Sequence, residues 1–419
     1  MPRLPSAKDG ITSEEAPRNA SASRTGAGVW VLFYCRALLA CADSLSFPFF
    51  AVYLSVERGV PMSYTGAYLS VCTLFAAFAR GFGGELSDMF GRKKMMRLSV
   101  AAGAALTLLM ALVIQLKLHF AWLMGLHAIG ALFAAFYGPA AQAWIADNSP
   151  KKQLAQHYGI IRIGENIGWV VGPALGGLLV EKYYALLFSV TAVMYAIALA
   201  VISLRVREIS PSSIRRHLQL KDMLAELRHP KFARLCALAF MMRAVMSQIV
   251  VGLSLYCVKF LGYPARSVGV LLSVNAAVVV ILQYFVGRGV KDFRISDTLT
   301  VGAMLYAVGY LTIGFSHIFI WTLIGVVIFT LGEMVVSPGM QSLGANIAPP
   351  GKTGRYLGIH GLAQQGGTSM GILLGGTNME QLAPIWREGP WVLIAFLATA
   401  TAIGFHGLRK QMTPDEDGI

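Results

Sequence analysis

The chain has 419 residues, of which 56% are hydrophobic and 13% are charged. A soluble protein carries about 25% charged residues, so this composition excludes a soluble globular protein and indicates one that crosses a membrane several times. The formal net charge of +14 does not indicate nucleic-acid binding, because the cations lie mainly in short segments between apolar runs.

The apolar runs predict an all-α membrane protein with twelve transmembrane helices, because each run is long enough to cross a bilayer as a helix. The predicted spans are 29–54, 64–86, 96–116, 120–146, 158–181, 183–205, 232–259, 264–287, 296–315, 318–343, 355–378 and 390–408. A polar tail at 1–28 precedes them, without the apolar core of a cleavable signal peptide. A polar linker at 206–231 divides them into six-helix groups at 29–205 and 232–408, and a tail at 409–419 follows.

The Lys and Arg residues outside the spans predict the orientation. An even number of spans places both termini on one side of the membrane. The loops, tails and span ends on that side hold 25 Lys and Arg residues, and the loops and span ends on the opposite side hold 6. Because cytoplasmic loops carry the excess of positive charge, we expect both termini to be cytoplasmic, in the inner membrane of a bacterium. The four arginines that remain inside spans are Arg36, Arg80, Arg162 and Arg243.

The first span contains two opposite charges. Arg36 and Asp43 are seven residues apart, which places them on nearly one helix face, about 10 Å from each other. A charge at the centre of a bilayer costs about 2.5–3.5 kcal/mol on insertion scales, so each needs a role. Asp43 is a candidate proton or cation site. Arg36 is a candidate substrate ligand, or it pairs with Asp43 or a backbone carbonyl.

Residues 84–94, between the second and third spans, read G-E-L-S-D-M-F-G-R-K-K. This loop has glycines for a tight turn, an aspartate and three adjacent cations. It resembles the signature loop between helices 2 and 3 of the major facilitator superfamily. The residues that carry the resemblance are Gly84, Asp88, Gly91, Arg92 and Lys93.

This resemblance implies that Asp88 helps to lock a cytoplasmic gate in one state of a transport cycle. The family pattern has an arginine directly after the aspartate, where this chain has Met89. We therefore expect Arg92 or Arg80 to be the partner of Asp88. The alternative is that the loop only sets the orientation of the protein through its positive charge.

The fifth span contains the pattern G-x-x-x-G-P-x-x-G-G, formed by Gly168, Gly172, Pro173, Gly176 and Gly177. The spacing of four places three of the glycines on one helix face, which a neighbouring helix can approach closely. The proline removes a backbone donor and bends the helix. Packing of small residues is one interpretation. The complete pattern resembles the motif of twelve-span drug:proton antiporters, which implies proton-coupled export.

Glu165 lies in the same span, three residues after Arg162. This spacing permits an ion pair within the helix. Such a pair would neutralise both charges near the cytoplasmic end of the span. The alternative is that Glu165 takes part in proton coupling.

The linker contains a segment at 212–228 in which apolar residues are spaced among basic ones. This pattern predicts an amphipathic helix at the cytoplasmic interface. We expect it to anchor the linker to the membrane surface.

The two groups of six spans are repeats of each other. A shift of 199 residues aligns 137–177 with 336–376 without gaps, with 11 identities in 41 positions, most of them glycines and prolines. A shift of 207 brings Arg36 onto Arg243. Together with the loop motif, the repeat predicts the major facilitator fold of two pseudo-symmetric six-helix bundles. In that fold the substrate path lies between the halves near the midplane.

The second group also has charges inside its spans. Two arginines, Arg36 and Arg243, in helices that line the cavity would suit an anionic or zwitterionic substrate. Glu333 lies in the middle of the tenth span, with no basic residue within a turn or two. An isolated carboxyl of this kind can take and release a proton. The pattern Gly-Glu-x-x-x-x-Pro around it resembles the tenth span of several bacterial multidrug exporters.

Four amide side chains inside spans are further candidates for the substrate cavity, although contacts between helices are their commoner use. They are Asn166, Gln248, Asn275 and Gln364. The sequence has no ATP-binding loop and no cluster with metal-ligand spacing. We therefore expect no enzyme activity, no cofactor and no metal, and we expect an ion gradient to supply the energy.

The sequence as a whole predicts a monomeric secondary transporter that exports small amphipathic molecules in exchange for protons by alternating access. Glu333, Asp43 and Glu165 are its candidate proton-coupling residues. One alternative is an exporter of a single metabolite, such as a siderophore or another carboxylate, held by Arg36 and Arg243. A second is an uptake symporter, and a third is a non-transporting sensor or a lipid scramblase.

Overall fold

The computed structural model describes residues 15–150, 153–180, 183–208, 226–349 and 352–418. The first six spans are α1 (Glu15–Val52) with a π turn at Tyr53–Glu57, α2 (Met62–Phe90), α3 (Arg92–Gln115), α4 (Phe120–Ala134) continued by α5 (Tyr137–Asn148), α6 (Leu154–Val180) and α7 (Tyr184–Arg205). The seventh span consists of α9 (Pro230–Met246), a 3-10 turn at Ser247–Ile249, α10 (Gly252–Leu255) and a π turn at Tyr256–Phe260. The last five are α11 (Ala265–Gly289), α12 (Ile295–Gly314), α13 (Phe319–Asn346), α14 (Thr353–Gln381) and α15 (Gly389–Arg409).

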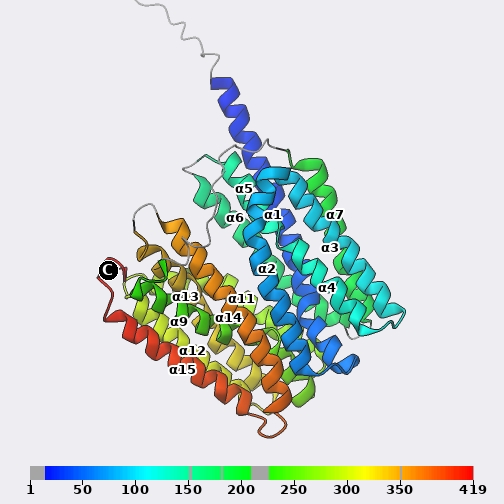
Figure 1. Ribbon diagram of the computed structural model, residues 1–419, viewed down its shortest axis with the longest axis vertical. Helices are drawn as coiled ribbons and strands as arrows, with labels where there is room; N and C mark the ends of the chain where they lie inside the picture. The colour runs from blue at the N-terminus through cyan, green and yellow to red at the C-terminus, as the bar shows by residue number, and fades with distance from the viewer. Residues whose placement is uncertain (1–14, 151–152, 181–182, 209–225, 350–351, 419) are drawn as a thin grey trace, which may run out of the picture.

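The predicted fold is confirmed. The described residues contain no strand, and their twelve helical spans form two groups of six, α1 to α7 and α9 to α15 (Figure 1). Ten spans are long and apolar enough to cross a membrane, and α12 and α14 are the two less apolar ones. For α14 the physical reason is its position, because it packs against α2 of the other half and against α9. Positions 212–225 of the predicted linker helix at 212–228 lie outside the described residues.

The two halves meet through α2 against α14 and through α6 against α11. They cross where glycines let the two backbones approach. A Cβ atom on Gly66 would lie 2.8 Å from the Cα of Gly376, and one on Gly269 would lie 3.0 Å from the Cα of Gly177. All four glycines lie toward the helix ends that are remote from the chain termini. The halves are therefore packed together on the side opposite the termini.

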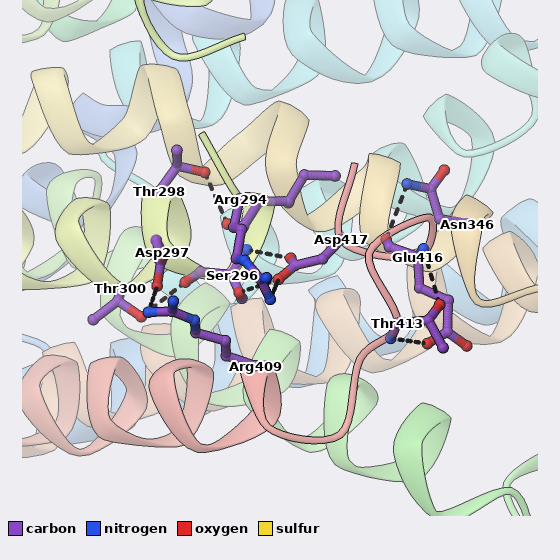
Figure 2. A network of polar contacts seen from close by, with 11 residues as sticks. Arg294, Ser296, Asp297, Thr298, Thr300, Asn346, Arg409, Thr413, Glu416 and Asp417 are labelled. Carbon is purple, nitrogen blue, oxygen red and sulfur yellow. Dashed lines mark hydrogen bonds and ion pairs between the residues drawn. The ribbon is translucent and has the colours of Figure 1, made fainter. Parts of the chain in front are cut away.

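In each half, an acidic residue that follows the last helix caps the third helix. Glu208, after α7, accepts a hydrogen bond from the backbone N–H of Lys93 in α3 at 3.2 Å. Asp417, after α15, accepts one from the backbone N–H of Ser296 in α12 at 2.8 Å (Figure 2). Lys93 and Ser296 each hold the second position of their helix, where the N–H has no partner within the helix. The two repeated halves therefore also share this acidic cap on their third helix.

The C-terminal tail makes further polar contacts with the second half, which Figure 2 shows in part. Glu416 forms an ion pair with Lys231 of α9 at 3.1 Å, and its carbonyl oxygen accepts from Asn346 of α13 at 3.1 Å. The carboxylate of Asp417 also accepts from the hydroxyl of Ser296 at 2.6 Å, and its side chain is fully buried. The tail therefore joins the termini-side ends of α9, α12 and α13.

The substitution Asp417→Ala is expected to destabilise the protein by about 1–3 kcal/mol, because it leaves the buried N–H and hydroxyl of Ser296 without an acceptor. Thermal unfolding of the purified protein in detergent measures the change. Asp415→Ala is the matched control, since Asp415 is exposed and two residues away. Equal unfolding temperatures for the two variants would contradict a stabilising role for the cap.

Candidate functional site

A cavity of about 1050 Å³ lies between the halves. Its walls come from α1, α2, α5 and α6 of the first half and from α9, α11, α12, α13 and α14 of the second, together with the turn after α9. The lining includes Ile145, Tyr158 and Gln341, which lie near the termini-side ends of their helices. The cavity therefore extends toward the side of the molecule that holds the termini.

All four arginines inside the spans face this cavity, together with two glutamates. The charged lining residues are Arg36, Arg80, Arg162, Glu165, Arg243 and Glu333, and the largest aromatic ones are Tyr137, Trp169 and Tyr306. Arg80 and Arg162 were not predicted to bind substrate, although a charge inside an apolar run marks each of them in the sequence. The face of each helix that lines the cavity depends on how the helices pack. The sequence therefore did not distinguish the aromatic residues of the lining from those elsewhere.

Glu165 forms an ion pair with Arg36 of α1. This corrects the expected pair within α6, because Arg162 has no ion-pair partner among the described residues. The two partners are 129 residues apart in the chain, so helical spacing carried no information about them. The pair neutralises one arginine of the cavity and joins α1 to α6.

The glycines of α6 explain why α1 lies close enough for that pair. A Cβ atom would lie 2.5 Å from the carbonyl oxygen of Ala37 if placed on Gly168, and 2.6 Å from that of Cys41 if placed on Gly172. Gly176 faces α1 in the same way, whereas Gly177 faces α11 of the other half. The helix continues through Pro173 without a break. This motif therefore lies both in the contact with α1 and in the contact between the halves.

Asp43 lies outside the lining of the cavity. Its carboxylate accepts a hydrogen bond from the hydroxyl of Tyr195 in α7, and it lies within electrostatic range of Arg36 and Glu165. Asp43 therefore belongs to a charged group between α1, α6 and α7, and no direct contact with the cavity is observed for it.

Glu333 lines the cavity from α13. Its carboxylate accepts a hydrogen bond from the amide of Asn275 in α11 at 3.0 Å, and the same amide donates to the hydroxyl of Thr330 at 2.9 Å. Within the described part of the chain, Glu333 has no ion-pair partner. A carboxyl held by an amide alone can change its protonation state without breaking an ion pair, unlike Glu165.

Arg243 lines the second half of the cavity from α9, within electrostatic range of Glu333 and Tyr306. Its Nε atom is buried and has no hydrogen-bond partner in the described residues. Arg36 and its symmetry partner thus both face the cavity, but they differ in their environment. Arg36 is neutralised by a neighbour, whereas part of the guanidinium of Arg243 is unsatisfied.

Two of the four candidate amides line the cavity and two do not. Asn166 and Asn275 are lining residues. Gln248 is 1% exposed and donates to the carbonyl oxygens of Ala244 at 3.0 Å and Gly371 at 2.7 Å, so it joins α9 to α14. Gln364 lies 3.0 Å from the Nδ1 of His360 within α14 and outside the lining. The expectation for these two glutamines is therefore corrected.

The loop motif at 84–94 lies at the end of α2 and the start of α3, outside the cavity. Arg92 forms an ion pair with Asp88, donates to Asp147 of α5 at 3.2 Å and donates to the hydroxyl of Ser87 at 2.7 Å. The partner of Asp88 is thus Arg92 and not Arg80. Asp147 was not predicted, because no pattern in the sequence around it indicates that it is the second acid of this network.

A glycine between the two helices is required at this loop. Gly91 has a φ of 99°, a backbone conformation that glycine adopts at little cost. A Cβ atom there would also lie 2.7 Å from the carboxylate of Glu208. The loop motif and the cap of α3 therefore depend on the same residue.

The chain is similar to known transporters over most of its length. The sequence model of the Major Facilitator Superfamily matches residues 32–372. The uncharacterized MFS-type transporter YdeE of Escherichia coli is 27% identical, over 89% of this chain and 94% of that protein. The Na(+), Li(+), K(+)/H(+) antiporter of Planococcus maritimus is 24% identical, over 86% of this chain and 90% of that protein. The quinolone resistance protein NorA of Staphylococcus aureus is 24% identical, over 86% of this chain and 91% of that protein.

The fold is also similar to that of solved transporter structures. A crystal structure of the nucleoside transporter NupG aligns with a TM-score of 0.79 at 12% sequence identity and covers 91% of this chain and 99% of that one. At this identity the match concerns the fold alone. The proteins named here, matched in sequence or in structure, are transporters and not enzymes.

Proposed function

This chain belongs to the Major Facilitator Superfamily, and on that premise we propose that it exports small amphipathic molecules in exchange for protons by alternating access. Two relatives support the proposal, because one is a cation/proton antiporter and the other a quinolone resistance protein. The cavity of about 1050 Å³ also supports it, because pockets for small molecules commonly measure about 300–1,000 Å³.

The observation that carries the proposal is the environment of Glu333. It is a carboxyl in the middle of a membrane span and it faces the cavity. Among the described residues, its hydrogen-bond partner is the amide of Asn275. A charge at this depth costs about 2.5–3.5 kcal/mol on insertion scales, so the protein retains it for a purpose. In the proposed cycle Glu333 takes a proton when the cavity faces outward and releases it inside, where substrate enters. Glu165 assists through its ion pair with Arg36, and Asp43 assists through its electrostatic interaction with Arg36.

We place both termini in the cytoplasm, in the inner membrane of a bacterium, because the positive charges gather on that side. In this orientation the described state is closed to the outside, and its cavity extends toward the cytoplasm. We propose that the transporter works as a monomer, since the cavity is complete within one chain.

A second candidate is export of one anionic or zwitterionic metabolite. The observation that favours it is the presence of four arginines against two glutamates in the lining. This candidate shares the cavity and the proton site with the first. It differs from the first in the range of molecules carried.

Proton flux in proteoliposomes tests the proposed function. The purified protein is reconstituted with an internal pH dye, and cationic, anionic and neutral compounds are added in turn. We expect at least one compound to move protons in the direction opposite to its own movement. Proton movement in the same direction would indicate a symporter. Lipid movement without any gradient and without proton flux would indicate a scramblase.

A further inference from the structure

The arginines of the first half outnumber the acids that could neutralise them. Arg36 is paired with Glu165. Arg80 of α2 lies within electrostatic range of both members of that pair, and Arg162 precedes Glu165 by about one helical turn. Neither Arg80 nor Arg162 has a hydrogen-bond or ion-pair partner in the described part of the chain. The first half therefore contributes three guanidinium groups and one carboxylate to the cavity lining, and that carboxylate is already paired.

A guanidinium group inside a membrane protein is costly unless water or a partner satisfies it. Arg80 and Arg162 are both exposed to the cavity, so water satisfies them while no substrate is bound. A substrate oxyanion would replace that water with charge-assisted hydrogen bonds. Arginine is suited to this role because its planar donors match a carboxylate or a phosphate.

The rest of the cavity suits an aromatic or apolar body attached to such a group. Tyr137, Trp169 and Tyr306 line it from both halves, and aromatic rings offer large apolar faces with a polar edge. The second half contributes Arg243 but also Glu333, so its charge is closer to balanced. The excess of positive charge is therefore on the first half.

We propose that the transported molecules carry an oxyanion group, a carboxylate or a phosphate, which binds at Arg80 and Arg162 while the body lies toward the second half. This inference rests on the proposed function only in taking the cavity to be the substrate site. It names a substrate class, small organic anions and zwitterions, and it excludes simple organic cations as preferred cargo.

Binding of matched probes to the full-length protein in detergent tests the proposal. The probes have benzene, naphthalene or pyrene as the body, each as a carboxylate, a carboxamide and a methylammonium. We expect at least one carboxylate to bind at least tenfold more tightly than its amide and its amine, with an affinity that falls as salt is added. If no carboxylate in the three series binds more tightly than its amide, the proposal is wrong.

Substitution of Arg80 and of Arg162 identifies the binding group. Arg80→Gln and Arg162→Gln are each expected to weaken carboxylate binding by about tenfold or more, the loss typical of a hydrogen bond to a charged group. Binding of the amide is expected to be unchanged. Arg97→Gln is the matched control, because Arg97 is exposed on α3 and does not line the cavity. A carboxylate preference that survives both cavity substitutions would overturn the assignment.

The two proposals fail separately. The binding measurement needs no membrane and no gradient, so it does not depend on proton coupling. Carboxylate preference without proton flux in proteoliposomes would leave the substrate class intact and refute the coupling. Proton flux driven only by cationic compounds would support the coupling and refute the substrate class.

Discussion

The substitution Glu333→Gln is expected to abolish proton-driven transport without lowering the amount of protein in the membrane. Glutamine keeps the size of the side chain and its hydrogen-bonding capacity toward Asn275, which lies 3.0 Å from the carboxylate, but it cannot bind and release a proton. Gradient-driven substrate movement should therefore fall to the level of vesicles without protein. Exchange of labelled for unlabelled substrate across the membrane needs no net proton transfer and should persist.

Two measurements separate a coupling role from damage to the fold. The rate of substrate-induced proton flux reports coupling, and exchange in the absence of a gradient reports an intact transport path. Glu388→Gln is the matched control, because Glu388 pairs with Arg387 at 3.2 Å outside the cavity. A Glu333→Gln protein with normal gradient-driven transport would show that Asp43 or Glu165 carries the proton instead. Loss of both activities would indicate a structural role.

The second large effect is expected at the contact between the halves, where Gly66→Leu should shift the protein toward the state that opens on the side opposite the termini. The backbones of α2 and α14 meet at this position, since a Cβ atom there would already lie 2.8 Å from the Cα of Gly376. Overpacking of a closed contact costs about 1–3 kcal/mol. A cost of this size changes the ratio of the two states by about 5-fold to 150-fold.

Cysteine labelling measures that shift. Val279 lines the cavity, so a Val279→Cys reporter in a background without the native cysteines reacts with a membrane-impermeant reagent only from the open side. Labelling from the side opposite the termini should rise in Gly66→Leu. Gly81→Leu is the matched control on the same helix, because a Cβ atom at Gly81 meets nothing within 4 Å. Unchanged labelling in Gly66→Leu would mean that this contact does not govern opening.

The sequence was sufficient to predict the fold because each of its signals is local or periodic. Apolar runs of membrane length define the spans, and glycines and prolines repeated at a shift of 199 reveal the two halves. The charges inside spans identified Arg36, Arg243, Glu165 and Glu333, which all line the cavity. A charge in an apolar run is costly wherever it lies, so it can be recognised without knowledge of the packing.

The sequence could not show which side chains meet across helices. Arg36 and Glu165 are 129 residues apart, whereas Arg162 is three residues from Glu165, so spacing favoured the wrong partner. Gln248 and Asn275 are both amides in apolar runs, but one joins α9 to α14 and the other faces the cavity. The difference depends on the rotation of each helix about its axis, and the polar residues of these spans do not determine that rotation.

An acidic residue on each side of the linker binds one half of the protein. Glu208 binds α3 of the first half, and Glu226 binds Lys352 and Arg355 of the second half at 3.0 and 3.1 Å. These two acids are 18 residues apart in the sequence and stand on either side of the linker. Each half therefore holds one end of the connection, and a cut between the two acids would leave both contacts in place.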